Sequence, residues 1–254
     1  MILDGKTVII TGAASGFGKA LAERLSQSNA RIVLADVNDA AGIHLKNQLN
    51  AIRPDSAVYY RCDVTRKFDL FNLFKYAKDH FGSVDVVCNN AGITENVPFA
   101  DNIQDNWLKV VDIDLISVIY GTRLAIEYFR KQGSGGVVIN TASLAGLIPS
   151  PIQPVYAAVK AGVVNFTRSL DFLKSEGIRV NAICPSYVKT GITESAKDLG
   201  FEITDWLPID LVIDAFIQAI ENENLAGECL RITTKYGIDF PFHRKLKSAR
   251  KANL

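Results

Sequence analysis

Short apolar segments alternate with longer amphipathic segments along the chain. Runs rich in Val and Ile predict buried strands, because a parallel sheet is covered on both faces. Apolar residues at three- and four-residue spacing predict helices between these strands. The expected strands are Thr7–Thr11, Arg31–Ala35, Ala57–Arg61, Val84–Cys88, Gly136–Asn140, Arg179–Cys184 and Glu228–Ile232, and the expected helices lie near 17–28, 39–51, 67–80, 104–131, 154–175 and 208–222. The alternation predicts an α/β fold, a doubly wound parallel sheet of about seven strands with helices on both faces.

Two of the expected helices are apolar around most of their circumference, over residues 107–129 and 154–173. Such a helix is covered on two sides. The sheet covers one side, and a partner subunit in a homodimer or homotetramer is expected to cover the other. The alternative is that a C-terminal segment of the same chain lies there.

The composition fits one large domain. The chain has 254 residues, is 48% hydrophobic and carries a net charge of +1. This balance gives no general electrostatic case for binding nucleic acid or an anionic membrane. With no repeat or linker visible, residues 1–242 are expected to form a single domain that includes the substrate pocket. Residues 243–254 form a basic tail, read as a solvated terminus, with RNA or membrane binding as an alternative that depends on the tail alone.

The four cysteines and three histidines are scattered, without the spacing of a disulfide framework or a metal site. The cysteines are read as reduced core residues, which favours a cytoplasmic location. No signal peptide and no apolar stretch long enough to span a bilayer are visible. The terminal Ala252-Asn253-Leu254 resembles a variant of the peroxisomal address, so the peroxisomal matrix is the alternative location.

A glycine-rich turn follows the first expected strand. Residues 11–18 read Thr-Gly-Ala-Ala-Ser-Gly-Phe-Gly and lead into an amphipathic helix. In this context, glycines let the backbone approach a pyrophosphate, and the helix N-terminus directs free N–H groups toward it. The turn therefore predicts a dinucleotide-binding fold of the Rossmann type, with cofactor contacts from Gly12, Ser15, Gly16, Phe17 and Gly18. A purely structural turn is the alternative.

Asp36 ends the second expected strand, eighteen residues after Gly18. A carboxylate there can accept both ribose hydroxyls of the adenosine and repels a 2′-phosphate. Since Ala13, Ala14, Val37 and Asn38 offer no positive charge, NAD is predicted as the cofactor in preference to NADP. A helix-capping role for Asp36 or Asn38 is the alternative, and both roles can coexist.

Tyr156 and Lys160 lie four residues apart on one face of an expected helix, after Ser143. The lysine ammonium is expected to lower the pKa of the tyrosine phenol from about 10 toward neutrality. A phenol tuned in this way exchanges a proton with an alcohol or a ketone.

These residues together resemble the short-chain dehydrogenase/reductase family. The matching stretches are Thr11–Gly18, Asn89-Asn90-Ala91-Gly92, Ser143 and Tyr156-Ala157-Ala158-Val159-Lys160, and the resemblance runs from about residue 5 to 240. Within the family, four stretches are similar to NAD-dependent hydroxyprostaglandin dehydrogenases: Ser117–Thr122, Ser143–Leu147, Gln153–Tyr156 and Ile232–Ile238.

The resemblance implies a role for each matched position. Tyr156 is implied as the acid/base, Lys160 as the donor to the nicotinamide ribose, and Ser143 as the residue that holds the substrate oxygen. The implied cofactor contacts are Asp63 and Val64 at the adenine, Asn90, Ala91 and Gly92 beside the adenine ribose and the central sheet, and Pro185, Val188 and Thr190 around the nicotinamide.

Two positions depart from the family pattern. Asp114 stands where the family usually has Asn, which shapes the long helix so that a backbone carbonyl holds a water in a proton relay. Asp is nearly isosteric and is expected to keep the backbone bend, but it brings a charge near Lys160, so the relay is expected to be retuned, weakened or lost. Ser186 follows Pro185 where the family favours Gly, which implies either backbone strain or a modest adjustment.

Apolar residues flank the region between Ser143 and Tyr156, and more lie in 190–207, a candidate lid that is short for that role. Apolar walls suit a hydrophobic secondary alcohol or ketone. Gln153 offers an amide to the substrate or caps the helix, and Tyr187 is a further candidate substrate contact. The leading hypothesis is an NAD-dependent alcohol dehydrogenase or ketone reductase. The alternative is an NAD-binding regulatory or structural protein of the same fold that has lost the chemistry.

Overall fold

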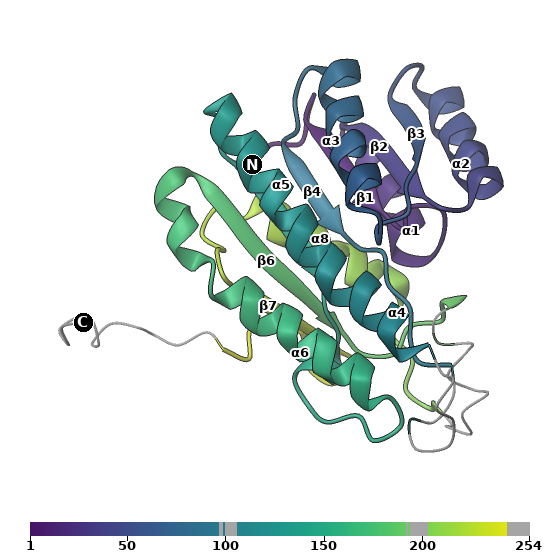
Figure 1. Ribbon diagram of the computed structural model, residues 1–254, viewed down its shortest axis with the longest axis vertical. Coiled ribbons are helices and arrows are strands. Elements are labelled where there is room, and N and C mark those ends of the chain that lie inside the picture. The colour runs from purple at the N-terminus through teal and green to yellow at the C-terminus, as the bar shows by residue number, and fades with distance from the viewer. Residues whose placement is uncertain (97–98, 100–105, 192, 194–202, 243–254) are drawn as a thin grey trace.

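The computed structural model describes residues 1–96, 99, 106–191, 193 and 203–242 (Figure 1). The basic tail, its terminal Ala252-Asn253-Leu254 and residues 192 and 194–202 of the expected lid lie outside the described residues. In the described part, no helix is long and apolar enough to cross a membrane.

A single eight-stranded sheet forms the centre of the fold, with the order β3-β2-β1-β4-β5-β6-β7-β8. Neighbouring strands are parallel except for β7 and β8, which are antiparallel. The strands are β1 (Thr7–Thr11), β2 (Arg31–Asp36), β3 (Ala57–Arg61), β4 (Val86–Asn89), β5 (Gly136–Thr141), β6 (Ile178–Pro185), β7 (Cys229–Thr233) and β8 (Gly237–Asp239). The predicted doubly wound α/β fold is confirmed, with β8 as one strand more than expected.

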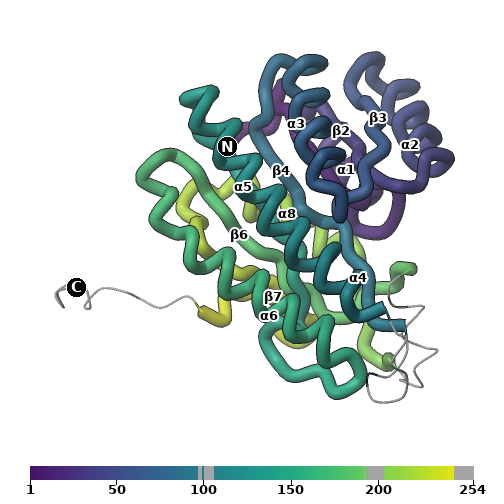
Figure 2. The backbone as a smooth tube through the Cα atoms, viewed as in Figure 1, coloured from purple at the N-terminus to yellow at the C-terminus, as the bar shows by residue number. Residues whose placement is uncertain are grey.

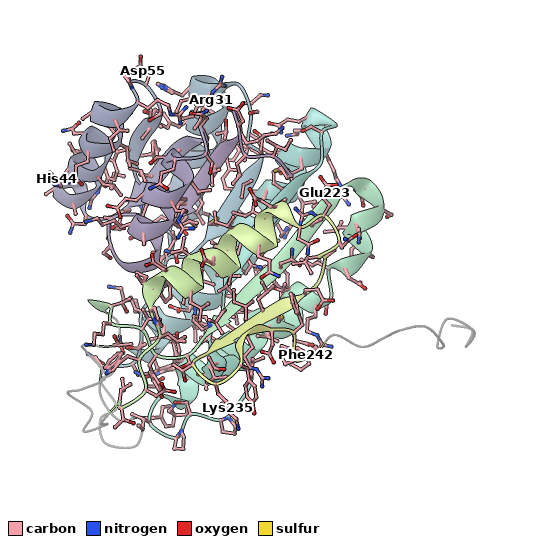
Figure 3. All side chains as sticks on the ribbon, turned by 180° about the vertical axis from the view of Figure 1, so that it is seen from behind. Arg31, His44, Asp55, Glu223, Lys235 and Phe242 are labelled. Carbon is pink, nitrogen blue, oxygen red and sulfur yellow. The ribbon has the colours of Figure 1, made fainter. Side chains whose placement is uncertain are left out.

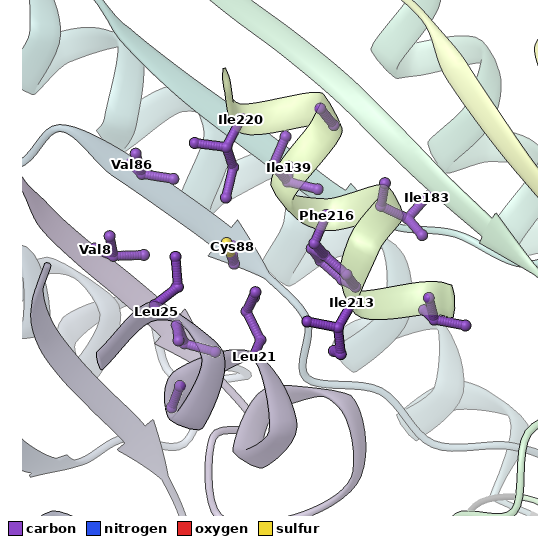
Figure 4. Close-up of a cluster of buried hydrophobic side chains, with 14 of the residues drawn as sticks. Val8, Leu21, Leu25, Val86, Cys88, Ile139, Ile183, Ile213, Phe216 and Ile220 are labelled. Atoms are coloured by element: carbon purple, nitrogen blue, oxygen red, sulfur yellow. The ribbon is translucent and has the colours of Figure 1, made fainter. Parts of the chain in front are cut away.

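Helices cover both faces of this sheet (Figure 1). They are α1 (Gly16–Ser26), α2 (Asp39–Ile52), α3 (Lys67–Phe81), α4 (Trp107–Val111), α5 (Ser117–Gln132), α6 (Pro154–Arg168) and α8 (Ile209–Glu221). One core cluster joins the sheet to α1, α2 and α8, and two others join its opposite face to α3, α5 and α6. Figure 4 shows Phe216 of α8 and Leu21 of α1 packed over the strand residues Val8 and Cys88.

The helix expected over 104–131 contains a local change of geometry. A π-helical segment, Asp112–Ile116, separates α4 from α5, and the three follow one continuous path (Figure 2). A π turn inserts one extra residue into the helix, and such turns are frequent at functional sites. Asp114 lies in this segment and is 0% exposed.

The helix expected over 154–175 ends earlier, at Arg168, and a 3₁₀ segment, Asp171–Glu176, follows it. Phe172 in this segment is 61% exposed, and Leu108 of α4 is equally exposed. In the isolated chain the second apolar side of these helices therefore remains partly accessible. Polar and charged side chains, among them Arg31, His44 and Asp55, lie on the outside of the molecule (Figure 3).

Parallel strands that point the same way place their carboxyl ends at one edge of the sheet. β1 and β4 are neighbours, but β2 follows β1 to one side and β5 follows β4 to the other. A crevice forms at such a reversal of strand order, and ligands of open α/β sheets bind there. The glycine-rich turn after β1 and the segment after β4 are both at this position.

Candidate active site

The three glycines of the glycine-rich turn occupy positions that disfavour a side chain. Gly12 and Gly16 have φ of 63° and 50°, in the left-handed region that favours glycine. A Cβ on Gly18 would lie 2.2 Å from the carbonyl oxygen of Gly12. Ser15 precedes α1 in an extended conformation, and its side chain makes no capping hydrogen bond to the helix. The first amides of α1 are thus left for an anion such as a pyrophosphate, so the turn fits a dinucleotide.

Asn90 connects this turn to the neighbouring strands. Its side-chain Nδ2 donates to the carbonyl of Thr11 at 2.9 Å, and its Oδ1 accepts from the hydroxyl of Thr141 at 3.3 Å. The Thr11 hydroxyl in turn accepts from the amides of Asn90 and Ala91 at 3.0 and 3.1 Å. A Cβ on Gly12 would lie 2.8 Å from the Cα of Ala91, so the two segments pack backbone against backbone.

Asp36 is directed at the glycine-rich turn. Its Oδ2 accepts from the amide of Ala14 at 2.9 Å and its Oδ1 from the amide of Asn38 at 3.0 Å. The cap of α2 is Asn38, whose side chain accepts from the amide of Ala41 at 3.1 Å. A carboxylate has about four acceptor positions, so Asp36 keeps capacity for ribose hydroxyls beside the two amides. The capping alternative therefore applies to Asn38, while the Asp36 carboxylate faces the turn.

Asp63 and Val64 follow β3 at the same edge of the sheet. Burial alone would raise the pKa of the Asp63 carboxyl, but hydrogen bonds from Thr65 and the charge of Arg66 bring that pKa below its usual value. The hydroxyl and amide of Thr65 donate to Asp63 Oδ1 at 2.7 and 3.0 Å. Val64 is buried. This fixed turn forms a polar and apolar wall at the carboxyl end of β3.

Ser143, Tyr156 and Lys160 come together where β5 ends and α6 packs over it. The Lys160 ammonium lies 5.4 Å from the centre of the Tyr156 ring and donates to the carbonyl of Thr141 at 2.7 Å. Ser143 hydrogen-bonds the Tyr156 phenol, and the amide of Ala145 donates to the Ser143 hydroxyl at 3.1 Å. The predicted i,i+4 spacing thus places phenol, ammonium and hydroxyl in one cluster.

The pKa of the Tyr156 phenol does not fall toward neutrality as expected from the sequence. Burial raises this pKa and is the largest influence. Lys160 and the hydrogen bond with Ser143 lower it, while the negative charge of Asp114 raises it. The net result is a pKa above the usual value. The expected effect of Lys160 is present, but burial and a second charged residue outweigh it.

Asp114 forms an ion pair with Lys160. Asp114 Oδ2 lies 2.9 Å from the Lys160 ammonium, and Oδ1 accepts from the amide of Ile93 at 2.9 Å. Burial raises the pKa of the Asp114 carboxyl, against the effect of Lys160. Burial favours neutral Lys160, but the charges of Asp114 and Tyr156 outweigh it and raise the Lys160 pKa. Because the two groups touch directly, each favours the charged form of the other.

Gly92 makes room for this ion pair, because a Cβ at residue 92 would lie 2.8 Å from Asp114 Oδ2. Its predicted place beside the adenine ribose stays a prediction. Asp114 lies in the middle of the π-helical segment, Asp112–Ile116.

Pro185 ends β6, and the chain then turns back over the glycine-rich turn. Val188 is buried and bridges Leu207, and Thr190 lies 3.7 Å from the position that a Cβ on Gly16 would take. Among the described residues, only Asn29 and Asp55 combine a side chain with positive φ, so the strain expected at Ser186 is absent. The Ser186 hydroxyl instead accepts from the amide of Tyr187 at 2.6 Å.

Gln153 occupies the position before α6, but its side chain makes no capping hydrogen bond. Its Nε2 is buried and has no hydrogen-bond partner among the described residues. A buried amide donor of this kind ordinarily has a partner. The helix-capping alternative is therefore wrong, and a substrate contact stays as the prediction. Tyr187, 38% exposed, stands on the chain segment that follows Pro185.

Two features of the site were not predicted from the sequence. Glu95 is 0% exposed and accepts from the amides of Val155 and Tyr156. Cys184 is buried near Lys160 and hydrogen-bonds Cys229, which raises the pKa of its thiol together with burial. All four cysteines are buried and free of disulfides. The one signal in the sequence was Gln153 at the N-cap position of α6. Glutamine is a poor N-cap residue, so the first amides of the helix need a hydrogen-bond acceptor from another part of the chain.

The fold and these groups define a dinucleotide-binding α/β protein with a Ser–Tyr–Lys cluster at the carboxyl edge of its sheet. The short chain dehydrogenase family model matches residues 6–199. The chain belongs to this family.

Several characterised proteins are similar over most of the chain. The 15-hydroxyprostaglandin dehydrogenase [NAD(+)] of Homo sapiens is 40% identical over 261 residues, which cover 94% of this chain and 95% of that protein. The 3beta-hydroxysteroid dehydrogenase 2 of Eggerthella lenta is 40% identical over 193 residues, 75% of this chain and 74% of that protein. Among solved structures, the 3-ketoacyl-(acyl-carrier-protein) reductase of Brucella melitensis complexed with NADH has a TM-score of 0.82 and 26% identity, and the match covers 91% of this chain and 97% of that one.

Proposed function

We propose that the protein is an NAD-dependent dehydrogenase that transfers hydride between a hydrophobic secondary alcohol and NAD, with Ser143, Tyr156 and Lys160 as its catalytic set. The observation that carries the proposal is the packed cluster in which Ser143 hydrogen-bonds Tyr156 and the Lys160 ammonium lies 5.4 Å from the phenol ring. The names of the relatives support a secondary alcohol as substrate, since they include hydroxyprostaglandin and hydroxysteroid dehydrogenases.

The choice of NAD is supported by the Asp36 carboxylate, which faces the glycine-rich turn through the amide of Ala14. A carboxylate at this position accepts ribose hydroxyls and repels a 2′-phosphate. In the proposal the amides of Ser15, Gly16 and Phe17 hold the pyrophosphate. Asp63, Val64 and the Asn90–Gly92 segment hold the adenosine half, and Pro185, Val188 and Thr190 hold the nicotinamide half.

NAD supplies the hydride acceptor and, when oxidised, a positive charge that favours the phenolate. Ser143 donates a hydrogen bond to the substrate oxygen, and Tyr156 as phenolate accepts the hydroxyl proton. An ammonium has three donors. Lys160 directs one at Thr141 and one at Asp114, and the third is assigned to the nicotinamide ribose. Asp114 acts through Lys160. In this proposal, a direct ion pair between Asp114 and Lys160 replaces the water-based proton relay of the family.

The substrate side is assigned to Gln153 and Tyr187 beside Ser143. The unpartnered Nε2 of Gln153 suits an oxygen of the substrate. The substrates proposed are hydroxyprostaglandin-like molecules, hydroxy fatty acids, retinoids, steroids and smaller secondary alcohols. Residues 1–242 act as one catalytic domain in this proposal, in a cytoplasmic protein, with a peroxisomal location as the alternative.

A homodimer or homotetramer is proposed from the exposed apolar side chains of the α4–α5 helix and the segment after α6. Leu108 is 61% exposed, and Trp107, Ile116 and Phe172 are also exposed. Isolated exposed apolar residues are common, but several on adjoining elements mark an interaction surface. Sedimentation of the full chain gives the subunit number.

The test is a panel of the secondary alcohols named above, each incubated with NAD while reduced nicotinamide is followed by absorbance. Turnover of at least one alcohol, with a clear preference for NAD over NADP, is the expected result. Tight NAD binding with no turnover of any alcohol, and of no matching ketone with NADH, contradicts the proposal. That outcome favours the alternative, an NAD-binding regulatory or structural protein of the same fold.

A further inference from the structure

A carboxylate from a distant loop caps the helix that carries Tyr156 and Lys160. Glu95 Oε1 accepts from the amide of Val155 at 3.1 Å, and Oε2 accepts from the amide of Tyr156 at 2.8 Å. Glu95 is 0% exposed although it is ionisable. A buried carboxylate of this kind is stable because helix N-terminal amides and the helix dipole favour negative charge.

The local sequence of α6 leaves these two amides without a nearby acceptor. Pro154 is the first helical residue and has no N–H. The first backbone bond of the helix runs from the amide of Ala157 to the carbonyl of Gln153 at 3.0 Å. The side chain of Gln153, in the N-cap position, makes no capping bond. Val155 and Tyr156 hold the second and third helical amides, which an N-cap side chain ordinarily satisfies. Glu95 takes both.

The short segment Ile93–Glu95, here called the strap, links both ends of the catalytic pair. At one end of the strap, Ile93 donates to Asp114, whose other oxygen pairs with Lys160 at 2.9 Å. At the other end, Glu95 holds the amide of Tyr156 itself. Asn106 fixes the strap between them, since its side chain bonds the carbonyl of Thr94 at 2.9 Å and the amide of Asn96 at 3.1 Å.

We propose that Glu95 is a positioning residue that sets the place of the Tyr156 phenol relative to Lys160 and the reacting carbon. This inference rests on the proposed function. Holding the backbone of Tyr156 at its own amide fixes the start of the side chain. Asp114 and the carbonyl of Thr141 hold the ammonium through contacts that do not involve the Glu95 side chain, so loss of the Glu95 carboxylate is expected to displace the phenol more than the ammonium. A misplacement of about 1 Å at a reacting group costs about 10²-fold in rate.

The test is the isosteric substitution Glu95→Gln, which removes the charge and one of the two acceptors. We expect faster hydrogen–deuterium exchange at the amides of Val155 and Tyr156, and a kcat lowered about tenfold or more. The dissociation constant for NAD stays within twofold, because the glycine-rich turn and Asp36 are untouched. With a substrate deuterated at the carbinol carbon, the isotope effect on kcat rises, since hydride transfer becomes slower than release.

Asp85→Asn is the matched control. Asp85 is also a buried carboxylate that accepts a backbone amide, from Thr7 at 2.9 Å, but it precedes β4, at the opposite edge of the sheet. The Asp85→Asn substitution is expected to lower the melting temperature of the protein. Its kcat and its isotope effect are expected to stay within twofold of those of the original protein. A purely structural role for Glu95 predicts this same behaviour in E95Q.

An E95Q protein with faster amide exchange but unchanged kcat and isotope effect overturns the positioning role. Unchanged exchange overturns the cap itself. If E95Q does not fold, Asn106→Ala loosens the strap without changing the Glu95 carboxylate. Amide exchange at Val155 and Tyr156, together with kcat and its isotope effect, then decides whether Glu95 positions Tyr156. If the original protein turns over no alcohol, the proposed function fails, and the exchange measurement still decides whether Glu95 holds Tyr156.

Discussion

Replacing Asp114 by Asn is expected to make alcohol oxidation faster at neutral pH. Asp114 is one of the influences that raise the Tyr156 pKa, so removing its charge lowers that pKa and increases the fraction of phenolate. Asn is nearly isosteric, and its Oδ1 can still accept from the amide of Ile93. The geometry of the π-helical segment is therefore kept while the charge is lost.

The magnitude follows from two distances that meet at the Lys160 ammonium, 2.9 Å to Asp114 and 5.4 Å to the centre of the Tyr156 ring. The carboxylate is then no more than about 8 Å from the ring centre. Two unit charges at about 8 Å interact by about 2 kcal/mol at an effective dielectric constant of about 20. That energy corresponds to roughly 30-fold in an equilibrium constant. A phenolate of lower pKa is also a weaker base, so an increase of about tenfold is expected in the rate.

The assay is kcat/KM for alcohol oxidation measured across pH. Where the phenol is mostly protonated, the rate rises with pH, and this rising limb is expected to move to lower pH in D114N. Asp112→Asn is the control, because Asp112 lies in the same π-helical segment but is exposed. Its profile is expected to match that of the original protein.

A D114N profile that coincides with the original, or that moves to higher pH, refutes the electrostatic reasoning. A fall in rate at every pH, with intact NAD binding, has a different meaning. It indicates that the ion pair holds Lys160 in place, and that its charge matters less than its geometry. Thermal melting of both variants shows whether loss of the buried pair has destabilised the fold.

Three other changes test separate parts of the site and fold. Asp36→Ser is expected to reduce the preference for NAD, measured as kcat/KM with NAD divided by kcat/KM with NADP, at least tenfold. An unchanged preference would show that Asp36 does not determine the choice of cofactor. Gln153→Met is expected to raise the KM for the alcohol several-fold with the KM for NAD unchanged; equal changes in both contradict a substrate contact. Burial alone would raise the pKa of Asp85, but hydrogen bonds from Thr7, Ser83 and Lys6 depress it in the folded state below its ordinary value of 3.8. Its contribution to stability is therefore present above about pH 4 and lost as pH falls through the folded pKa, so denaturant unfolding across acid pH is expected to show a flatter decline in D85N.

The sheet was largely predictable because its strands are continuous apolar runs with clear ends. β1 and β3 begin and end where the sequence predicted. β8 was missed because it has three half-buried residues after a turn, and it is defined by pairing with β7. Pairing between strands is a tertiary property, which a pattern along the chain does not contain.

The candidate site also has parts that the sequence predicted and parts that depend on the tertiary structure. Tyr156, Lys160 and the glycine-rich turn are local patterns, and the fold brings them to one edge of the sheet as expected. Asp114 forms its ion pair from a π-helical segment that the sequence pattern did not predict, and Glu95 comes from a loop about sixty residues away from the amides it holds. The direction of the Tyr156 pKa was wrong because burial and the Asp114 charge, unlike the i,i+4 spacing, appear only in three dimensions.

The most direct measurement of the central claim is turnover by Tyr156→Phe beside its binding of NAD. Phenylalanine keeps the ring and removes only the hydroxyl that exchanges the proton. Oxidation of the best alcohol substrate is expected to fall below detection while the dissociation constant for NAD stays within a few-fold of the original. Appreciable remaining turnover in a correctly folded Y156F protein would show that a different group carries the proton.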